Sequence, residues 1–156
     1  MKKKSTYITP HKLYILMRND LPSMNPGKAM AQSAHAANQF IHSYSNDANV
    51  KKWQTEGRGF GTTIVLAVDK AGLLTIQCQA ERLHVHRGTV HDTTYPFIVD
   101  TEICELMSKW CQTSDPIYKE NGKVIMFRDE ITCGYLFIAD NSPYKETLVG
   151  SLPLYP

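Results

Sequence analysis

Residues 25–40, NPGKAMAQSAHAANQF, place groups capable of chemistry on an alanine-rich segment that we predict to be a helix. At about 100° per residue, one side of this helix carries a polar stripe made of Lys28, Gln32, His35 and Gln39. We expect the opposite side to pack on a sheet, and it consists of Met30, Ala34, Ala37 and Ile41. The alternative is an ordinary amphipathic surface helix with a solvated polar face.

Lys28 is the most informative member of this stripe because it falls in the first helical turn. Asn25 suits the N-cap and Pro26 the first helical position. A cation there opposes the partial positive charge of the helix terminus, an unfavourable effect of about 0.3–1 kcal/mol. A phosphate or a developing oxyanion, bound by Lys28 and the backbone N–H groups, would compensate for it. The segment is not a Walker A loop, since Pro22 stands at the first glycine position and Ala29 at that of the Ser/Thr.

Asp92 is a second candidate, at the end of a predicted strand in TVHDTTYP. In open α/β sheets, ligands bind beyond the carboxyl ends of the strands. If the first and third predicted strands are parallel neighbours, Lys28 and Asp92 share one rim of the sheet, and His91 or Thr94 could join them. The alternative for Asp92 is a turn or capping role, which is common for Asp before Thr-Thr.

The spacing of apolar residues and turn signals predicts the elements that position these groups. We expect strands at 12–18, 62–68, 84–92 and 131–139, helices at 26–44, 70–83, 101–113 and 142–150, a loop with room for a helical turn at 45–61, and a hairpin around 121–122. In the helix at 70–83, Asp69 is the expected cap, and the candidate core residues are Leu73, Leu74, Ile76 and Cys78. The alternation predicts an α/β three-layer sandwich with helices on both faces of the sheet.

Composition is typical of one ordinary domain. The chain has 156 residues, 42% of them hydrophobic, and a net charge of +2. The basic start, residues 1–11, is expected to be a loose tail that either contacts a polyanion or is simply solvated. It is followed by no apolar run long enough for a secretory signal or a membrane span. The four cysteines form no CxxC pair, so we expect a reducing, cytoplasmic setting.

The helix motif and the strand before it resemble the start of the archaeal/eukaryotic-type (type 2) peptidyl-tRNA hydrolases. In KLYILMRNDL…NPGKAMAQSAHAA, the residues at matching spacings are Gly27, Lys28, Gln32, His35, Ala36 and Ala37. Trp53, the Gly-containing loop after it and TTIVLAVD are also similar to the family, as is the strand that ends in Asp92. The resemblance is convincing over about 12–92 and weaker around 131–154.

This resemblance implies a mixed, mostly parallel four-stranded sheet flanked by helices, and hydrolysis of the ester between a peptide and the 3′ end of tRNA. It implies no metal and no organic cofactor, and the expected partner is peptidyl-tRNA, with a homodimer left open. The family's functional lysine and aspartate fall on Lys28 and Asp92, and its late threonine on Thr132. Gln32 and His35 are then candidates for substrate binding, with a structural role as the alternative for His35.

The sequence departs from the family after Asp92, where Thr93, Thr94, Tyr95 and Pro96 replace the expected Ala-Gly, one residue and Thr. Thr94 could substitute for that threonine, and we include it among the substrate-binding candidates. An insertion at about 97–129 carries the extra helix and hairpin within a single domain, 1–156. These departures leave two alternatives: a non-catalytic module that binds tRNA or protein, and an enzyme of similar fold that acts on another ester or amide.

Other chemistry finds little support in the sequence. There is no G-x-S-x-G elbow for a serine hydrolase. His84-x-His86, with His91 nearby, could suggest a metal site. No Cys or carboxylate stands at a familiar ligand spacing from these histidines, so we expect no metal.

Overall fold

A computed structural model of the chain describes residues 10–56, 58–100, 118–120 and 123–156. The chain divides into two compact units, one made of residues 1–90 and 132–156 and the other of residues 91–131. Each unit is described by itself below. The expectation of a single domain over 1–156 stays a prediction.

The first unit combines a sheet with helices, as the alternating sequence pattern predicts. Its elements are β1 (His11–Arg18), α1 (Pro26–Tyr44), α2 (Ala48–Thr55), β2 (Thr63–Val68), α3 (Lys70–Arg82), the start of β3 (His86–Asp100), the end of β5 (Lys123–Ala139) and the π-helix η1 (Glu146–Gly150). The predicted helix at 26–44 is therefore confirmed in full. The loop expected at 45–61 contains a complete helix, α2, and the final helix is shorter than the predicted 142–150.

The strand order is β2-β1-β5-β3. β1 pairs with β2 in parallel and with β5 in antiparallel orientation. The α/β class with a mixed sheet is thus confirmed, but parallel pairing is limited to β1–β2 in the registers that the structure describes. β5 lies between β1 and β3, so the premise that the first and third predicted strands are neighbours is wrong. Strand order depends on long-range pairing, which the local pattern does not encode.

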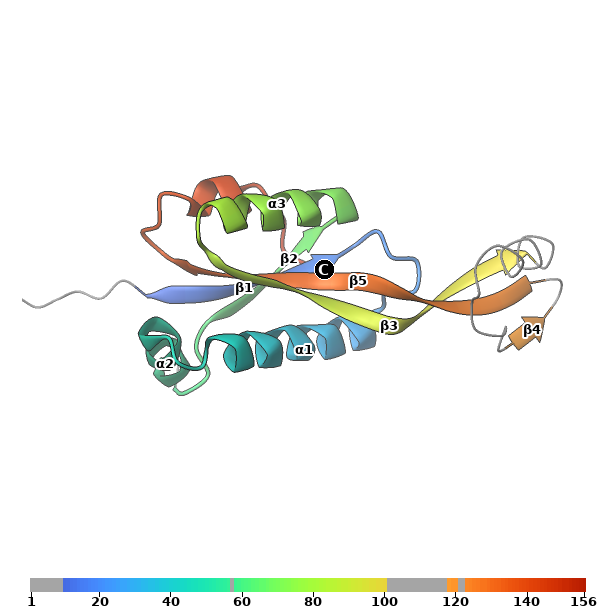
Figure 1. Ribbon diagram of the computed structural model, residues 1–156, viewed down its shortest axis with the longest axis horizontal. Coiled ribbons are helices and arrows are strands. Elements are labelled where there is room, and N and C mark those ends of the chain that lie inside the picture. Colours follow the sequence, from blue (N-terminus) through green and yellow to red (C-terminus); the bar gives the residue numbers. More distant parts are fainter. Residues whose placement is uncertain (1–9, 57, 101–117, 121–122) are drawn as a thin grey trace, which may run out of the picture. The chain divides into compact units, whose positions relative to one another are not determined.

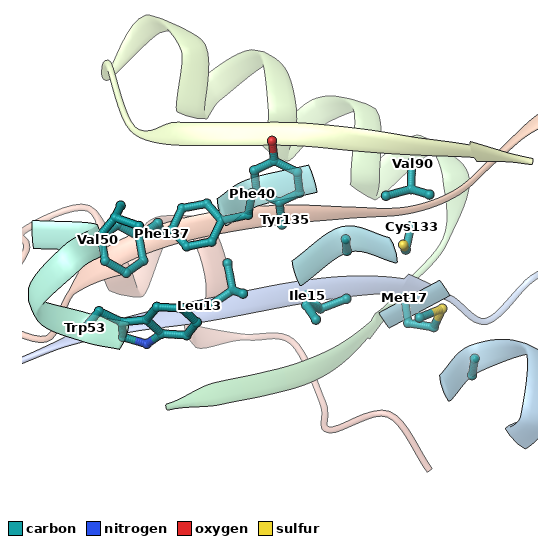
Figure 2. Packing of buried hydrophobic residues seen from close by; sticks show 12 residues of the cluster. Leu13, Ile15, Met17, Phe40, Val50, Trp53, Val90, Cys133, Tyr135 and Phe137 are labelled. Carbon is teal, nitrogen blue, oxygen red and sulfur yellow. The ribbon is translucent and has the colours of Figure 1, made fainter. Parts of the chain in front are cut away.

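The main core lies between the sheet and one layer of helices. Alternate residues of β1, Leu13, Ile15 and Met17, point to this side and pack with residues of α1, α2 and the strands β3 and β5. Figure 2 shows this cluster, with Val50, Trp53 and Leu13 near Phe137 at one end and Met17, Cys133 and Val90 at the other. In Figure 1, α1 and α2 lie on one face of this part of the sheet and α3 on the other.

An aromatic group fixes the position of α2. Phe40 makes edge-on contacts with Trp53 and Tyr135, at 5.6 and 5.7 Å between ring centroids, a favourable geometry for aromatic rings. The Trp53 indole N–H donates to the Thr62 carbonyl over 3.1 Å. Gly61 follows with φ +67°, and a Cβ there would lie 2.2 Å from the Trp53 ring, so a glycine is needed on two counts.

The buried side of α1 agrees only in part with the expected one, since Ala37 and Ile41 pack against the core as predicted. Ala29, Ala36 and Phe40 face the core, whereas Met30 is 69% exposed and Ala34 is exposed too. The prediction that Met30 packs on the sheet is wrong. The reason is that alanines occupy five of the nine positions from 29 to 37 and point in several directions, so the apolar stripe is too broad to show which side the sheet covers.

The core of α3 is likewise predicted only in part. Asp69 caps the helix, its side chain accepting from the Gly72 N–H, as expected. Leu73 and Ile76 are buried, but Leu74 and Cys78 are exposed. The remaining buried residues of α3 are Gln77 and Ala80.

The second unit contains the ends of two long strands and a hairpin. β4 (Tyr118–Glu120) pairs in antiparallel orientation with β5, with Glu120 opposite Lys123. The predicted hairpin is therefore confirmed, although its turn, 121–122, and the predicted helix at 101–113 lie outside the described residues. A small core of Val124 and Met126 holds this unit together, with Phe97 and Val99 packed against it.

The chain ends beside the sheet edge formed by β2. Leu154 forms an antiparallel bridge with Leu66, and the Tyr155 N–H donates to the Val65 carbonyl. In the described part of the chain, no helix has the length and apolar character that crossing a membrane requires.

Candidate functional site

The N-terminus of α1 positions Lys28. The Asn25 side chain accepts from the Lys28 backbone N–H over 3.0 Å, and Pro26 occupies the first turn, which confirms the predicted cap. The Lys28 side chain is half-buried, and its ammonium donates to the Ser23 hydroxyl over 3.2 Å. Ser23 lies in the turn before the helix and was not a sequence candidate. The signal that the sequence offered for this contact was a serine five residues before Lys28, in the turn that leads into the helix.

The same turn is joined to the start of α3 through Asp20, which also forms an ion pair with Arg18. Arg18, 4% exposed at the end of β1, donates two hydrogen bonds of 2.8 Å to the two carboxylate oxygens of Asp20. The Lys70 N–H, at the start of α3, donates to Asp20 over 3.3 Å. The hydrogen bonds from Arg18 hold the pKa of Asp20 below its usual range. The chain between β1 and α1 therefore begins at a charged pair that is held by two hydrogen bonds.

Gln32 lies one turn after Lys28 and is bonded to the sheet. The Thr132 hydroxyl donates to Gln32 Oε1 over 2.8 Å and has a second acceptor, the Val90 carbonyl, at 3.3 Å. Cys133 Sγ lies 3.5 Å from the Gln32 carbonyl. Thr132 is fully buried, and its single hydroxyl proton is engaged within the protein. Thr132 is therefore placed to hold Gln32, and burial separates it from a substrate in solvent.

The other two members of the predicted polar stripe, His35 and Gln39, are exposed on α1. The structure thus bonds Lys28 to the preceding turn and Gln32 to the sheet, and it leaves His35 and Gln39 exposed. A substrate contact by His35 stays a prediction.

Asp92 and Thr94 belong to the second unit, where they bond to each other. The Thr94 N–H and hydroxyl both donate to Asp92 Oδ1 over 2.9 Å. Asp92 is half-buried and Thr94 exposed. His91 Nδ1 lies 3.2 Å from Asp129 Oδ2. A shared rim for Lys28 and Asp92 stays a prediction.

No group of three or more His, Cys, Asp or Glu side chains with a metal-binding arrangement occurs within the described ranges. The strand expected at 84–92 begins only at His86, and His84, with φ +54°, precedes it. Burial raises the pKa of the Cys133 thiol to about 12, so this cysteine stays protonated and is a poor nucleophile.

An apolar cavity of about 380 Å³ lies on the other flank of α1. It is lined by Ala29, Met30 and Ser33 of the helix, by Val65 of β2 and by Tyr155. Neither Lys28 nor Gln32 reaches it, so the polar group described above is separate from this cavity.

Comparison with known proteins identifies the family. No curated protein matches the sequence. Among solved structures, a protein of unknown function from Agrobacterium tumefaciens strain C58 is similar, with a TM-score of 0.54 and 10% identity over 96% of this chain and 100% of that one; at that identity the likeness concerns the fold alone. The family model of peptidyl-tRNA hydrolase PTH2 matches residues 11–110. These include Lys28, Gln32, His35, Asp92 and Thr94, whereas Thr132 lies beyond them. Because the match spans more than half of the sequence, the chain belongs to the peptidyl-tRNA hydrolase PTH2 family.

Proposed function

We propose that this protein hydrolyses the ester that joins a peptide, or an N-blocked amino acid, to the 3′ end of tRNA. The observation that carries the proposal is the family match over 11–110, combined with a half-buried lysine in the first turn of α1. A first-turn lysine is unfavourable unless an anion binds there. Peptidyl-tRNA supplies such anions, in its terminal phosphates and in the oxyanion of the reacting ester.

Lys28 is assigned to charge stabilisation. Its ammonium is oriented by Ser23. Pro26 has no N–H and the Lys28 N–H is bonded to Asn25, so the ammonium is the group that would bind the negative charge that develops on the ester carbonyl oxygen. Preorganised donors of this kind contribute about 10²- to 10³-fold to the rate.

Asp92 is assigned to the nucleophilic water. Thr94 donates twice to Oδ1, which fixes the carboxylate plane and leaves Oδ2 as the oxygen for a water molecule. The step balances without a cofactor. Asp92 accepts a proton as the water oxygen bonds to the ester carbon, the bond from that carbon to the ribose oxygen breaks, and the proton passes to the ribose oxygen. The products are tRNA with a free 3′ end and a peptide carboxylic acid, which releases the second proton of the water to solvent and becomes a carboxylate.

Gln32 and Thr132 are assigned as a unit in which Thr132 acts through Gln32. The buried Thr132 hydroxyl holds the Gln32 amide oxygen, so the amide NH₂ is the group that would reach the substrate. Thr132 is then a positioning residue. His35, exposed on the same helix, is assigned to contact with the tRNA.

The direct test mixes the purified protein with N-acetylaminoacyl-tRNA carrying a labelled amino acid. We expect release of the labelled acid by the wild type and a loss of about 100-fold or more in Lys28→Ala and Asp92→Asn. Lys51→Ala and Asp129→Asn, which replace exposed residues of the same two types, are the matched controls and should keep the wild-type rate. The non-catalytic alternative predicts tRNA binding with no release at any protein concentration, and that result would overturn the proposal.

The proposal places this reaction in the cytoplasm, where peptidyl-tRNA is found and where unpaired thiols persist. Cys78 and Cys133 are both free thiols in the structure. A homodimer stays a prediction.

A further inference from the structure

A second pocket, which is polar and has a volume of about 220 Å³, lies where β1 begins and β5 ends. Three histidines line it, His11, His84 and His86, together with Asn49, Ser142 and Tyr144. These residues come from four separate parts of the chain. All of them belong to the first unit, and neither Lys28 nor Gln32 is among them.

Ring stacking holds two of these imidazoles in place. His86 stacks on Tyr44 of α1 with 4.2 Å between ring centroids and 11° between ring planes. His11 stacks on Phe137 at 4.9 Å and 20°. Phe137 also lines the pocket and belongs to the main core. Stacking on Tyr44 and Phe137 thus holds the imidazoles of His86 and His11 in position.

An acidic partner fixes the tautomer of His86. Its Nε2 lies 3.0 Å from Asp47 Oδ2, and the hydrogen bond from His86 holds the pKa of Asp47 below its usual range. An ionised carboxylate only accepts hydrogen bonds, so Nε2 carries the proton. The other nitrogen, Nδ1, becomes a donor only when the ring is positively charged.

The charges around the pocket favour an anion. No carboxylate appears among its lining residues within the described chain. Three acids on the adjoining elements are paired: Asp47 with His86, Glu81 with Arg87, and Asp140 with both Lys12 and Lys145. A positive charge on His86 is balanced by Asp47, so the positive charge that the pocket can offer an anion is that of His11 and His84.

We propose that this histidine pocket binds a phosphate group and, on the basis of the proposed function, that it takes a backbone phosphate of tRNA away from the scissile ester. Tyr44, against which His86 stacks, follows Lys28 by 16 residues on the same helix. At 1.5 Å per residue the two lie about 24 Å apart along the axis. At 100° per residue they also lie about 160° apart around the helix axis, so a ligand that contacts both positions has to be a polyanion that passes around α1 and cannot be a small ester.

The first test needs neither tRNA nor hydrolysis. Histidine ring resonances of the full-length protein are followed by NMR during titration with inorganic phosphate, at about pH 6 and about pH 8. The chain has six histidines, so three outside the pocket, His35, His42 and His91, serve as internal controls. We expect the resonances of His11, His84 and His86 to shift at the lower pH and much less at the higher one. Equal shifts of all six, or none, would refute the pocket.

The second test measures tRNA binding at about pH 6 as a function of salt. The variant combines His11→Gln with His84→Asn, because asparagine tolerates the left-handed backbone of His84. We expect the variant to bind tRNA roughly tenfold more weakly than the wild type. We also expect the slope of log K against log[salt] to show about one counterion fewer released on binding. His42→Gln, which replaces an exposed histidine on α1, is the control. Wild-type tRNA affinity in the double variant, with phosphate shifts present in the first test, would refute the tRNA assignment. Both readouts are independent of whether the ester is hydrolysed.

Discussion

The hydrogen bond between Thr132 and Gln32 has a measurable energetic signature. In Thr132→Val the side-chain shape is kept and the hydroxyl is lost, so the Gln32 amide oxygen and the Val90 carbonyl lose a donor. Because Thr132 is fully buried, we expect the free energy of unfolding to fall by about 1–2 kcal/mol. For a chain of this size, each kcal/mol corresponds to a Tm change of about 2–4 °C.

Replacing the acceptor, Gln32, should lower the free energy of unfolding by less than replacing the donor, Thr132. In Gln32→Leu the Thr132 hydroxyl keeps a second acceptor, the Val90 carbonyl at 3.3 Å, so we expect a loss of about 1 kcal/mol or less. The double variant should be no less stable than Thr132→Val alone, because both polar partners are then absent. The resulting coupling energy is about 0.5–1.5 kcal/mol.

The assay is urea unfolding followed by far-UV circular dichroism, with the m-value checked for each variant. Thr63→Val, at an exposed threonine of β2, is the matched control and should change the free energy of unfolding by no more than about 0.5 kcal/mol. Losses in the two single variants that add within about 0.3–0.5 kcal/mol would show that Thr132 does not hold Gln32, and would refute its assignment as a positioning residue.

Two further predictions concern the core. Gly61→Ala should lower the free energy of unfolding by about 2–4 kcal/mol, because it combines a left-handed backbone with overlap of the Trp53 ring. Gly59→Ala has the same kind of backbone and no atom within 4 Å; its cost should be about 1–2 kcal/mol in the same urea assay, and equal costs would contradict the packing explanation. Since the pKa of Cys133 is raised to about 12, iodoacetamide at about pH 8 should label the exposed Cys78 and leave Cys133 unmodified in peptide mass spectra of the native protein. Equal labelling of both would show that the Cys133 thiol is accessible.

The sequence specified α1 well because its signals are local. Asn25, Pro26 and the residues up to Tyr44 define a cap, a first turn and a length that the structure repeats. Which side of α1 faces the core was not predictable in the same way. The buried positions 29 and 36 and the exposed position 34 are all alanine, so residue type does not distinguish them. Helix α2 was predicted only as a loop with room for a helical turn, because its eight residues are mostly polar and only Val50 and Trp53 signal burial.

The candidate site shows the same division between local and long-range information. Lys28 lies where the spacing predicted, because the first turn of a helix is fixed within a few residues. The burial of Thr132 against Gln32 joins positions 100 residues apart, and it depends on β5 lying beside β1. No local pattern encodes that pairing. The bond between Thr94 and Asp92, two residues apart, is of the local kind, and it follows the usual turn chemistry of Asp.

The central claim is that Lys28 and Asp92 act on one reacting ester. It is tested most directly by kcat/KM for N-acetylaminoacyl-tRNA in Lys28→Ala, in Asp92→Asn and in the variant that carries both. Groups that act together in one step are strongly non-additive, so the account predicts that the double variant is no slower than the slower single variant. Losses that multiply in the double variant, or a wild-type rate in either single variant, would contradict it.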